Sequence, residues 1–251
     1  YLILLQEIFL QNKQMLNVKD ISKSIKGKKI VSKVSIEIHE SDIFGLLGPN
    51  GAGKTTTFYI IAGLMNPDAG EIKLSNQDIS KLPMHKRSKL GIKYLPQEPS
   101  VFQNLTVYEN LLGLAELSFK NNKDITDFVS SSIEEFGLSD ITKLKGRQLS
   151  GGQRRKVEIA RTLAAKPKII LLDEPFAGID PIAIEDIKKV LKKLSGKGIG
   201  ILITDHNVRE TLEICNQAAI ISNGEIISQG TKEKLISDEL VKEVYLGNMY
   251  K

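Results

Sequence analysis

Short apolar runs alternate along the chain with segments in which apolar residues recur every three or four positions. The runs at residues 43–47, 168–173 and 198–204 are almost wholly apolar, which is typical of strands buried on both faces of a sheet. Residues 55–64 and 184–194, which follow two of these runs, have the character of helices. Buried strands that alternate with helices predict an α/β fold with a mainly parallel sheet.

Other segments predict strands outside this buried sheet. Residues 16–20 and 34–39 alternate between apolar and polar side chains, as half-exposed strands do, and a turn at residues 27–29 separates them. Asn223-Gly224 lies between two apolar runs and is a strong hairpin signal. The remaining expected strands are residues 71–74, 92–95, 218–222 and 225–229. We therefore expect an antiparallel β subdomain at the edge of the core.

The pattern changes to helix alone in residues 106–144. There Val107, Leu111, Leu114 and Leu117 recur at helical spacing. This block predicts an α-helical subdomain, inserted into the α/β core at about residues 98–165.

The strands and helices together predict a single domain of residues 16–247. Met15 precedes the first convincing strand, so residues 1–15 are expected to be an N-terminal extension outside the fold. Residues 248–251 are expected to form a short C-terminal tail.

The composition is that of an ordinary globular protein and excludes few function classes. Of the 251 residues, 41% are hydrophobic and 26% are charged, and the net charge is +5. No basic block or aromatic-interleaved patch accompanies this charge, so nucleic-acid binding is not expected. No apolar run approaches the ~18 residues that span a bilayer, and no targeting signal is evident, which predicts the cytoplasm. The single cysteine, Cys215, excludes an internal disulfide.

A phosphate-binding loop follows the apolar run at residues 43–47. The loop fits the pattern G-x-x-x-x-G-K-[ST], and the strand before it and the helix after it are the context that this motif requires. Its glycines let backbone N–H groups reach phosphate oxygens, Lys54 can reach the β- and γ-phosphates, and the Thr55 hydroxyl can ligate Mg²⁺. The loop residues are Gly48, Pro49, Asn50, Gly51, Ala52, Gly53, Lys54, Thr55 and Thr56. The chain is therefore expected to bind ATP with Mg²⁺.

Two acids end the buried strand at residues 168–173. A carboxylate at the carboxyl end of a central strand lies beside the phosphate loop in this kind of fold. Asp173 is therefore expected to hold Mg²⁺, and Glu174 to orient or deprotonate an attacking water.

A second expected anion site opens the helical segment at residues 154–165. Ser150 has the character of an N-cap, and Gly151 and Gly152 leave backbone N–H groups open to a ligand. Gln153 completes the motif. The position of this motif shortly before the Asp173 strand distinguishes it from an ordinary loop.

These motifs together resemble the nucleotide-binding subunits of ATP-binding cassette (ABC) transporters. Residues 48–56 match the family's phosphate loop, residues 149–153 its signature, and residues 171–174 its second acidic motif. The other matches are Gln97 to the Q-loop glutamine, residues 177–180 to the D-loop, and His206 to the switch histidine. The motifs follow the family's order, and the resemblance covers residues 16 to about 230.

Within that family the chain is more closely similar to the lipopolysaccharide-export ATPases. The similarity lies in the residues that surround the short motifs, which generic ABC ATPases seldom share. These stretches are residues 55–59, 94–98, 171–183, 202–212 and 244–247.

The resemblance implies a mechanism in which two copies of the chain pair head to tail. Each ATP would lie between Lys54 of one copy and the Ser150 motif of the other. Gln97 would join Thr55 and Asp173 at Mg²⁺, and Gln97 and His206 would act with Glu174 in catalysis. The homodimer would bind two transmembrane permease subunits at the cytoplasmic face of the inner membrane and associate with the membrane only through them.

Two positions carry weaker expectations. Phe102 resembles the aromatic residue of the groove that receives the transmembrane subunits, and the alternative is a core residue of the helical subdomain. Ile25 stands where the family usually has an aromatic residue that stacks on adenine, so an apolar contact to the base is expected without ring stacking.

Three other functions are weighed against the export of lipopolysaccharide. The nearest is the ATPase of another ABC transporter, such as a branched-chain amino acid importer. A soluble ABC ATPase that acts on nucleic acid or ribosomes usually has two cassettes or a long coiled-coil insertion, which this chain does not have. A small-molecule kinase would share the phosphate loop but would not explain residues 149–153.

Overall fold

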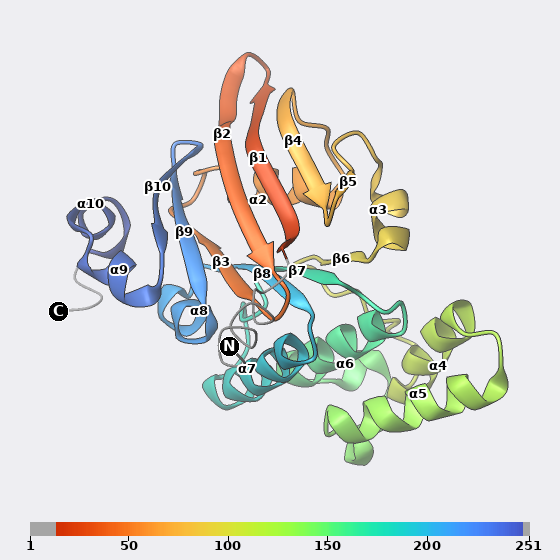
Figure 1. Cartoon of the computed structure of the whole chain (residues 1–251). Helices are drawn as coiled ribbons and strands as arrows, with labels where there is room; N and C mark the ends of the chain where they lie inside the picture. Colours follow the sequence, from red (N-terminus) through yellow and green to blue (C-terminus); the bar gives the residue numbers. More distant parts are fainter. Residues whose placement is uncertain (1–13, 248–251) are drawn as a thin grey trace, which may run out of the picture.

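A computed structural model describes residues 14–247, which form two sheets and the helices around them (Figure 1). The larger sheet has six strands in the order β10-β9-β3-β8-β7-β6. All of its pairs are parallel except the β9–β10 hairpin. The strands are β3 (Ile43–Leu47), β6 (Ile92–Leu95), β7 (Ile169–Asp173), β8 (Gly200–Thr204), β9 (Gln217–Ser222) and β10 (Glu225–Gly230). This arrangement confirms the expected α/β fold.

The central strands are apolar throughout because both faces of the sheet are covered. Every residue of β3, β7 and β8 is buried. Along β7 the side chains alternate between two cores, with Ile169 and Leu171 in one and Ile170 and Leu172 in the other. In the register of β7 with β8, Asp173 lies opposite Thr204, so that two polar residues meet at the carboxyl edge of the sheet.

The smaller sheet is antiparallel and has the order β2-β1-β4-β5. Its strands are β1 (Gln14–Ile25), β2 (Lys28–His39), β4 (Ala69–Leu74) and β5 (Gln77–Asp78). Their apolar residues share one core with α2 (Lys54–Ala62) and one face of the larger sheet. Gln14 and Met15 belong to β1, so the strand begins inside the stretch predicted to be an extension, and residues 1–13 lie outside the described residues.

Helices alone occupy residues 107–163, apart from short turns and one isolated β-bridge. They are α4 (Val107–Ser118), α5 (Asn122–Glu135), the 3-10 turns η1 (Ser139–Ile141) and η2 (Gly146–Gln148), and α6 (Gly151–Leu163). Val107 and Leu111 are buried as their spacing predicts, but Leu117 is 85% exposed. Leu117 is two residues from the buried Ala115 and therefore points to another side of α4, so its assignment to the apolar face was wrong.

The remaining helices flank the larger sheet. These are α3 (Met84–Leu90), α7 (Pro181–Gly196), α8 (Val208–Ile214), α9 (Lys232–Ser237), α10 (Glu239–Val241) and the π-helical turn η3 (Lys242–Leu246). In Figure 1, α7 and α8 lie beneath the sheet, and α9 and α10 lie beyond its β10 edge. Within residues 14–247, none of these helices combines the length and the apolarity that a membrane crossing requires.

Candidate functional site

The phosphate loop connects β3 to α2, as predicted, and two of its glycines are required by close backbone contacts. Gly48 has φ 153°, and a Cβ there would lie 2.0 Å from the carbonyl oxygen of Ile221. Gly53 has φ 106°, and its Cβ would lie 2.7 Å from the carbonyl oxygen of Ile30. Only glycine fits both the left-handed conformation and the available space. Strand β9 and the antiparallel sheet therefore hold the loop in place from outside.

Lys54 opens α2 and folds its side chain back over the loop. Its Nζ donates hydrogen bonds to the carbonyl oxygens of Gly48 and Pro49, at 2.7 and 2.9 Å. Burial lowers the pKa of Lys54, and the negative charges of Glu174 and Asp173 partly oppose this effect. The amine is thus held inside the loop, close to where phosphate groups bind in such motifs.

A cavity of about 780 Å³ opens over the loop. It brings together most of the predicted site residues from four separate segments. Its lining comprises Ile25, Lys26, Lys28, Ile30, Asn50, Gly51, Gly53, Lys54, Thr55, Thr56, Asp173, Glu174, Thr204 and His206. The cavity lies at the carboxyl ends of β3, β7 and β8, the place where open α/β sheets bind ligands.

Asp173 is buried at the end of β7 with a single hydrogen bond to its carboxylate among the described residues. The hydroxyl of Tyr94 donates to Asp173 Oδ2 at 3.0 Å. Burial raises the pKa of Asp173, while the Tyr94 hydrogen bond and the charges of Arg155, His206 and Lys54 limit the rise. Asp173 therefore keeps one carboxylate oxygen for a ligand.

Glu174 stands at the centre of the predicted catalytic group. Its φ of 45° is unusual for a residue other than glycine, and such strain is concentrated at functional sites. Gln97 Nε2 donates to Glu174 Oε2 at 2.7 Å, and His206 Nε2 lies 2.5 Å from Glu174 Oε1. Three residues that are far apart in the sequence thus meet at one carboxylate.

Gln97 approaches Glu174 from a second cavity rather than from the cavity over the phosphate loop. This second cavity, of about 410 Å³, has Gln97, Gly151 and Arg155 in its wall, and Glu174 lines both cavities. Gln97 contacts Glu174, and both its catalytic role and its role as a metal ligand stay predictions.

The signature motif caps α6, and none of its residues lines the cavity over the phosphate loop. Ser150 Oγ accepts from the Gln153 backbone N–H at 3.2 Å, and the Ser150 N–H donates to Gln153 Oε1 at 3.0 Å, which is a capping box. Ser150, Gly152 and Gln153 line a cavity of about 310 Å³ with Asp180. A Cβ on Gly152 would lie 2.4 Å from the Ala183 Cβ, so this glycine also permits close packing on α7.

Ile25 and Phe102 are both partly exposed. Ile25, at the end of β1, is 37% exposed and lines the cavity over the phosphate loop, where it is open to a nucleotide base. Phe102 is 50% exposed, and the guanidinium carbon of Arg161 lies 4.6 Å from its ring centroid. The exposure of Phe102 argues against the alternative that it is a core residue of the helical subdomain.

Three residues of the site have no motif signal in the sequence analysis. Tyr94 binds the Asp173 carboxylate. Arg155 donates to the carbonyl oxygens of Pro96 and Asp173. Asp205 accepts from the Phe176 backbone N–H at 3.0 Å and ties the segment after Glu174 to the segment that carries His206. Tyr94 and Asp205 lie in stretches that resemble the lipopolysaccharide-export ATPases, and Arg155 lies two residues after Gln153, but neither signal indicated a role for these side chains.

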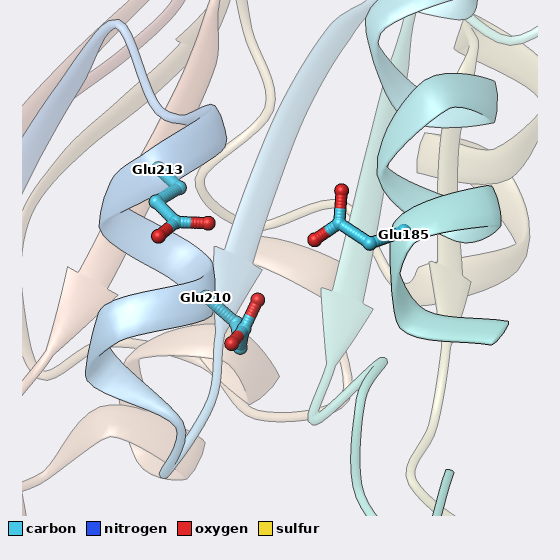
Figure 2. A group of neighbouring side chains, drawn as sticks. All are labelled: Glu185, Glu210 and Glu213. Carbon is cyan, nitrogen blue, oxygen red and sulfur yellow. The ribbon is translucent and has the colours of Figure 1, made fainter. Parts of the chain in front are cut away.

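An acidic cluster lies between α7 and α8. Figure 2 shows Glu185 on α7 and Glu210 and Glu213 on α8. One carboxylate oxygen of each lies within 4.8 Å of those of the other two. The buried Nζ of Lys188 donates to all three. Because this amine already binds all three carboxylates, the glutamates form an ion-pair network rather than a cation site.

The residues around Asp173 fit a hard divalent cation. Asp173 and Thr55 offer a carboxylate and a hydroxyl, the oxygen ligands that Mg²⁺ accepts beside water and phosphate. Thr204 Oγ1, in the same cavity wall, is buried and without a hydrogen-bond partner in the described structure. An orphaned hydroxyl next to a buried carboxylate is a place where a coordinated water completes the hydrogen bonding.

Comparison with known proteins agrees with this geometry. Residues 31–177 match the family described as ABC transporter. The lipopolysaccharide export system ATP-binding protein LptB of Haemophilus influenzae is 53% identical over 94% of this chain and 99% of that protein. The protein of the same name from Escherichia coli K12 is 49% identical over 94% and 98% of the two chains.

Solved structures show the same fold. An ATP-binding cassette of an ABC transporter in its ADP conformation has a TM-score of 0.83 and 31% identity, and the match covers 93% of this chain and 99% of that one. A dimeric post-hydrolysis state of an ATP-binding cassette bound to ADP and phosphate has a TM-score of 0.76 and 26% identity, over 86% and 98% of the two chains.

Proposed function

Because this chain belongs to the ABC transporter family and is an ATPase of that family, we propose that it energises the export of lipopolysaccharide. The similarity to export-system proteins, 53% identity over 94% of the chain, carries the choice of substrate. The contacts at Glu174 support the chemistry, because a carboxylate beside the phosphate loop is held there by two predicted partners.

In the proposed site the phosphate-loop amides and Lys54 bind the β- and γ-phosphates of ATP. Thr55 and Asp173, with Gln97 from the Q-loop, hold Mg²⁺, which supplies charge neutralisation on these phosphates. The apolar side chain of Ile25, in the wall of the cavity, contacts the adenine base.

Glu174 acts on the attacking water as the general base. Its carboxylate accepts hydrogen bonds, so it can orient the water and take its proton. His206 contacts the γ-phosphate of bound ATP and senses its loss. His206 pairs with Glu174 in this structure, so the γ-phosphate of ATP competes with Glu174 for the histidine. This competition couples ATP binding to release of the Glu174 carboxylate from His206.

Two copies of the chain complete each other's sites in this proposal. The signature residues Ser150, Gly151, Gly152 and Gln153 bind the γ-phosphate of the ATP held by the other copy. Their absence from the wall of the cavity over the phosphate loop supports an arrangement in trans. The pairing is isologous, so one two-fold axis makes two composite sites.

The homodimer drives two transmembrane permease subunits at the cytoplasmic face of the inner membrane, and it reaches the membrane only through them. Phe102 is our candidate contact to these subunits, because half of its side chain is exposed beside Arg161. No nucleic acid takes part. The transmembrane subunits carry lipopolysaccharide, and this chain supplies the free energy of ATP binding and hydrolysis.

The variant Glu174→Gln tests the proposed chemistry. The amide keeps the size of the side chain but cannot take a proton, so turnover is expected to fall by about 100-fold or more. ATP binding should persist, and the variant should elute as an ATP-dependent dimer in size-exclusion chromatography. Glu98→Gln, at an exposed neighbouring acid, is the matched control. Phosphate release at the wild-type rate from Glu174→Gln would show that Glu174 is not the base.

The same variant tests the transported substrate when it is purified from membranes in the presence of ATP. We expect the trapped complex to contain two transmembrane proteins and bound lipopolysaccharide, measured by mass spectrometry. Recovery of an amino acid permease instead would support the alternative function, the ATPase of a branched-chain amino acid importer.

A further inference from the structure

Tyr94 connects the strand before the Q-loop to the carboxylate of Asp173. It lies on β6, next to β7 in the larger sheet, and its register partner is Leu171, two residues before Asp173. Its hydroxyl donates to Asp173 Oδ2 at 3.0 Å. This is the hydrogen bond that holds the Asp173 side chain, because the described residues provide no other for its carboxylate.

The ring of Tyr94 is held firmly enough to aim this hydroxyl. Tyr59 on α2 packs against it edge to face, with ring centroids 6.2 Å apart and an interplanar angle of 87°. Tyr94 also lines a separate cavity of about 270 Å³ between α3, β6 and α6. A tyrosine has only two rotatable side-chain bonds, so the packing against Tyr59 restricts the position of its hydroxyl.

The backbone of Asp173 is held separately from its side chain. Arg155 donates to the Asp173 carbonyl oxygen at 3.2 Å, and this arginine pairs with Glu158. The terminal torsion of an aspartate is broad and roughly two-fold, so a fixed backbone does not by itself decide how the plane of the carboxylate is turned toward the cavity. The orientation of the carboxylate therefore depends on Tyr94.

We propose that Tyr94 is a positioning residue for the metal site: its hydroxyl holds Asp173 Oδ2 and so presents Oδ1 to Mg²⁺. This rests on the proposed function, in which Asp173 holds that ion. Outer partners that orient metal-binding carboxylates typically contribute 10–100-fold to metal affinity. Tyr94 thereby links the wall of the 270 Å³ cavity to the nucleotide site through one side chain.

The test compares nucleotide affinity with and without the ion. The dissociation constant of a fluorescent ATP analogue is measured in EDTA and in Mg²⁺, and the ratio of the two reports how strongly the ion supports binding. Tyr94→Phe keeps the ring against Tyr59 and removes only the hydroxyl. We expect the constant in EDTA to stay at the wild-type value and the Mg²⁺ concentration for half-maximal binding to rise about 10-fold.

A double-mutant cycle with Asp173→Ala separates positioning from packing. If Tyr94 acts through the carboxylate, Tyr94→Phe should have no further effect on the ratio once Asp173 is alanine. A wild-type Mg²⁺ requirement in Tyr94→Phe overturns the proposal, and so does an equal effect of Tyr94→Phe in both backgrounds. If Asp173→Ala alone leaves the ratio unchanged, the assignment of Asp173 in the proposed function fails instead.

Discussion

Glu174 has a conformation that its neighbours impose. A φ of 45° costs a glutamate on the order of 1 kcal/mol, and the N–H of Glu174, which donates to the Thr204 carbonyl at 2.7 Å, helps to hold it. Its carboxylate is then closed in by Gln97 and His206. The strained backbone thus belongs to the residue that we propose as the base. The side chain of this residue lines the cavity over the phosphate loop.

Two loop glycines offer a matched test of how the phosphate loop is held. Gly48→Ala would place a Cβ 2.0 Å from the Ile221 carbonyl oxygen, whereas a Cβ on Gly51 meets nothing within 4 Å. We expect Gly48→Ala to lower the free energy of unfolding by about 3 kcal/mol or more, and Gly51→Ala by about 1 kcal/mol. Urea denaturation measures both, and equal losses would contradict the contact with β9.

At the scale of elements, α7 and α8 are tied together next to the switch histidine. Lys188 on α7 donates to Glu210 and Glu213 on α8, and α8 begins two residues after His206. Although burial disfavours the charged amine, its hydrogen bonds to the glutamates outweigh burial and raise the pKa of Lys188. This network, whose three glutamates are drawn in Figure 2, therefore ties α7 to the helix that follows His206.

Lys188→Met should break this tie. The side chain is buried and the glutamates are partly exposed, so we expect a loss of about 2 kcal/mol in the free energy of unfolding at neutral pH. Lys189→Met, with a side chain that is 76% exposed, is the control and should change it by less than about 0.5 kcal/mol.

The pH dependence of this loss gives a second measurement. The hydrogen bond from Lys188 lowers the pKa of Glu213 below its ordinary value of 4.5. This hydrogen bond therefore contributes fully to the free energy of unfolding above pH 4.5, and the contribution is lost as the pH falls through the lowered pKa. The difference between wild type and Lys188→Met should therefore shrink below pH 4.5. A difference that stays constant down to pH 3 would contradict an ionic origin.

At the scale of the whole molecule, the two anion-binding motifs lie in different cavities of one chain. The walls that contain Lys54 and Ser150 share no residue. A site that needs both motifs is then made between two chains, which is why we propose that a single copy is incomplete.

Mixing two inactive variants tests this arrangement. Lys54→Ala removes the phosphate-loop amine and Ser150→Ala removes the signature hydroxyl, so each homodimer has two defective sites. A mixed dimer has one intact composite site, and the ATPase activity of the mixture should exceed the sum of the separate activities. Thr106→Ala removes an equivalent capping box from α4 and should remain active alone. Activity that is not restored by mixing would contradict composite sites.

The sequence by itself determined the elements whose signals are local. The bounds of β3 and β6 were predicted without error because short apolar runs bounded by turn residues need no distant contact to be recognised. The phosphate loop and the caps of α6 and α7 follow from residues within a few positions of one another. The antiparallel sheet was predicted in kind but not in extent, because β1 runs from Gln14 to Ile25 and β2 from Lys28 to His39, well beyond the predicted 16–20 and 34–39.

Only the tertiary structure decided which side chains meet. Glu174 contacts Gln97 across 77 positions, and Asp173 contacts Tyr94 across 79. Their contact depends on the order β8-β7-β6 in the sheet and on the left-handed turn at Glu174, and neither leaves a local pattern. The same holds for the exposure of Leu117, since helical spacing defines a face of a helix but does not show which side of its last turn the neighbouring elements cover.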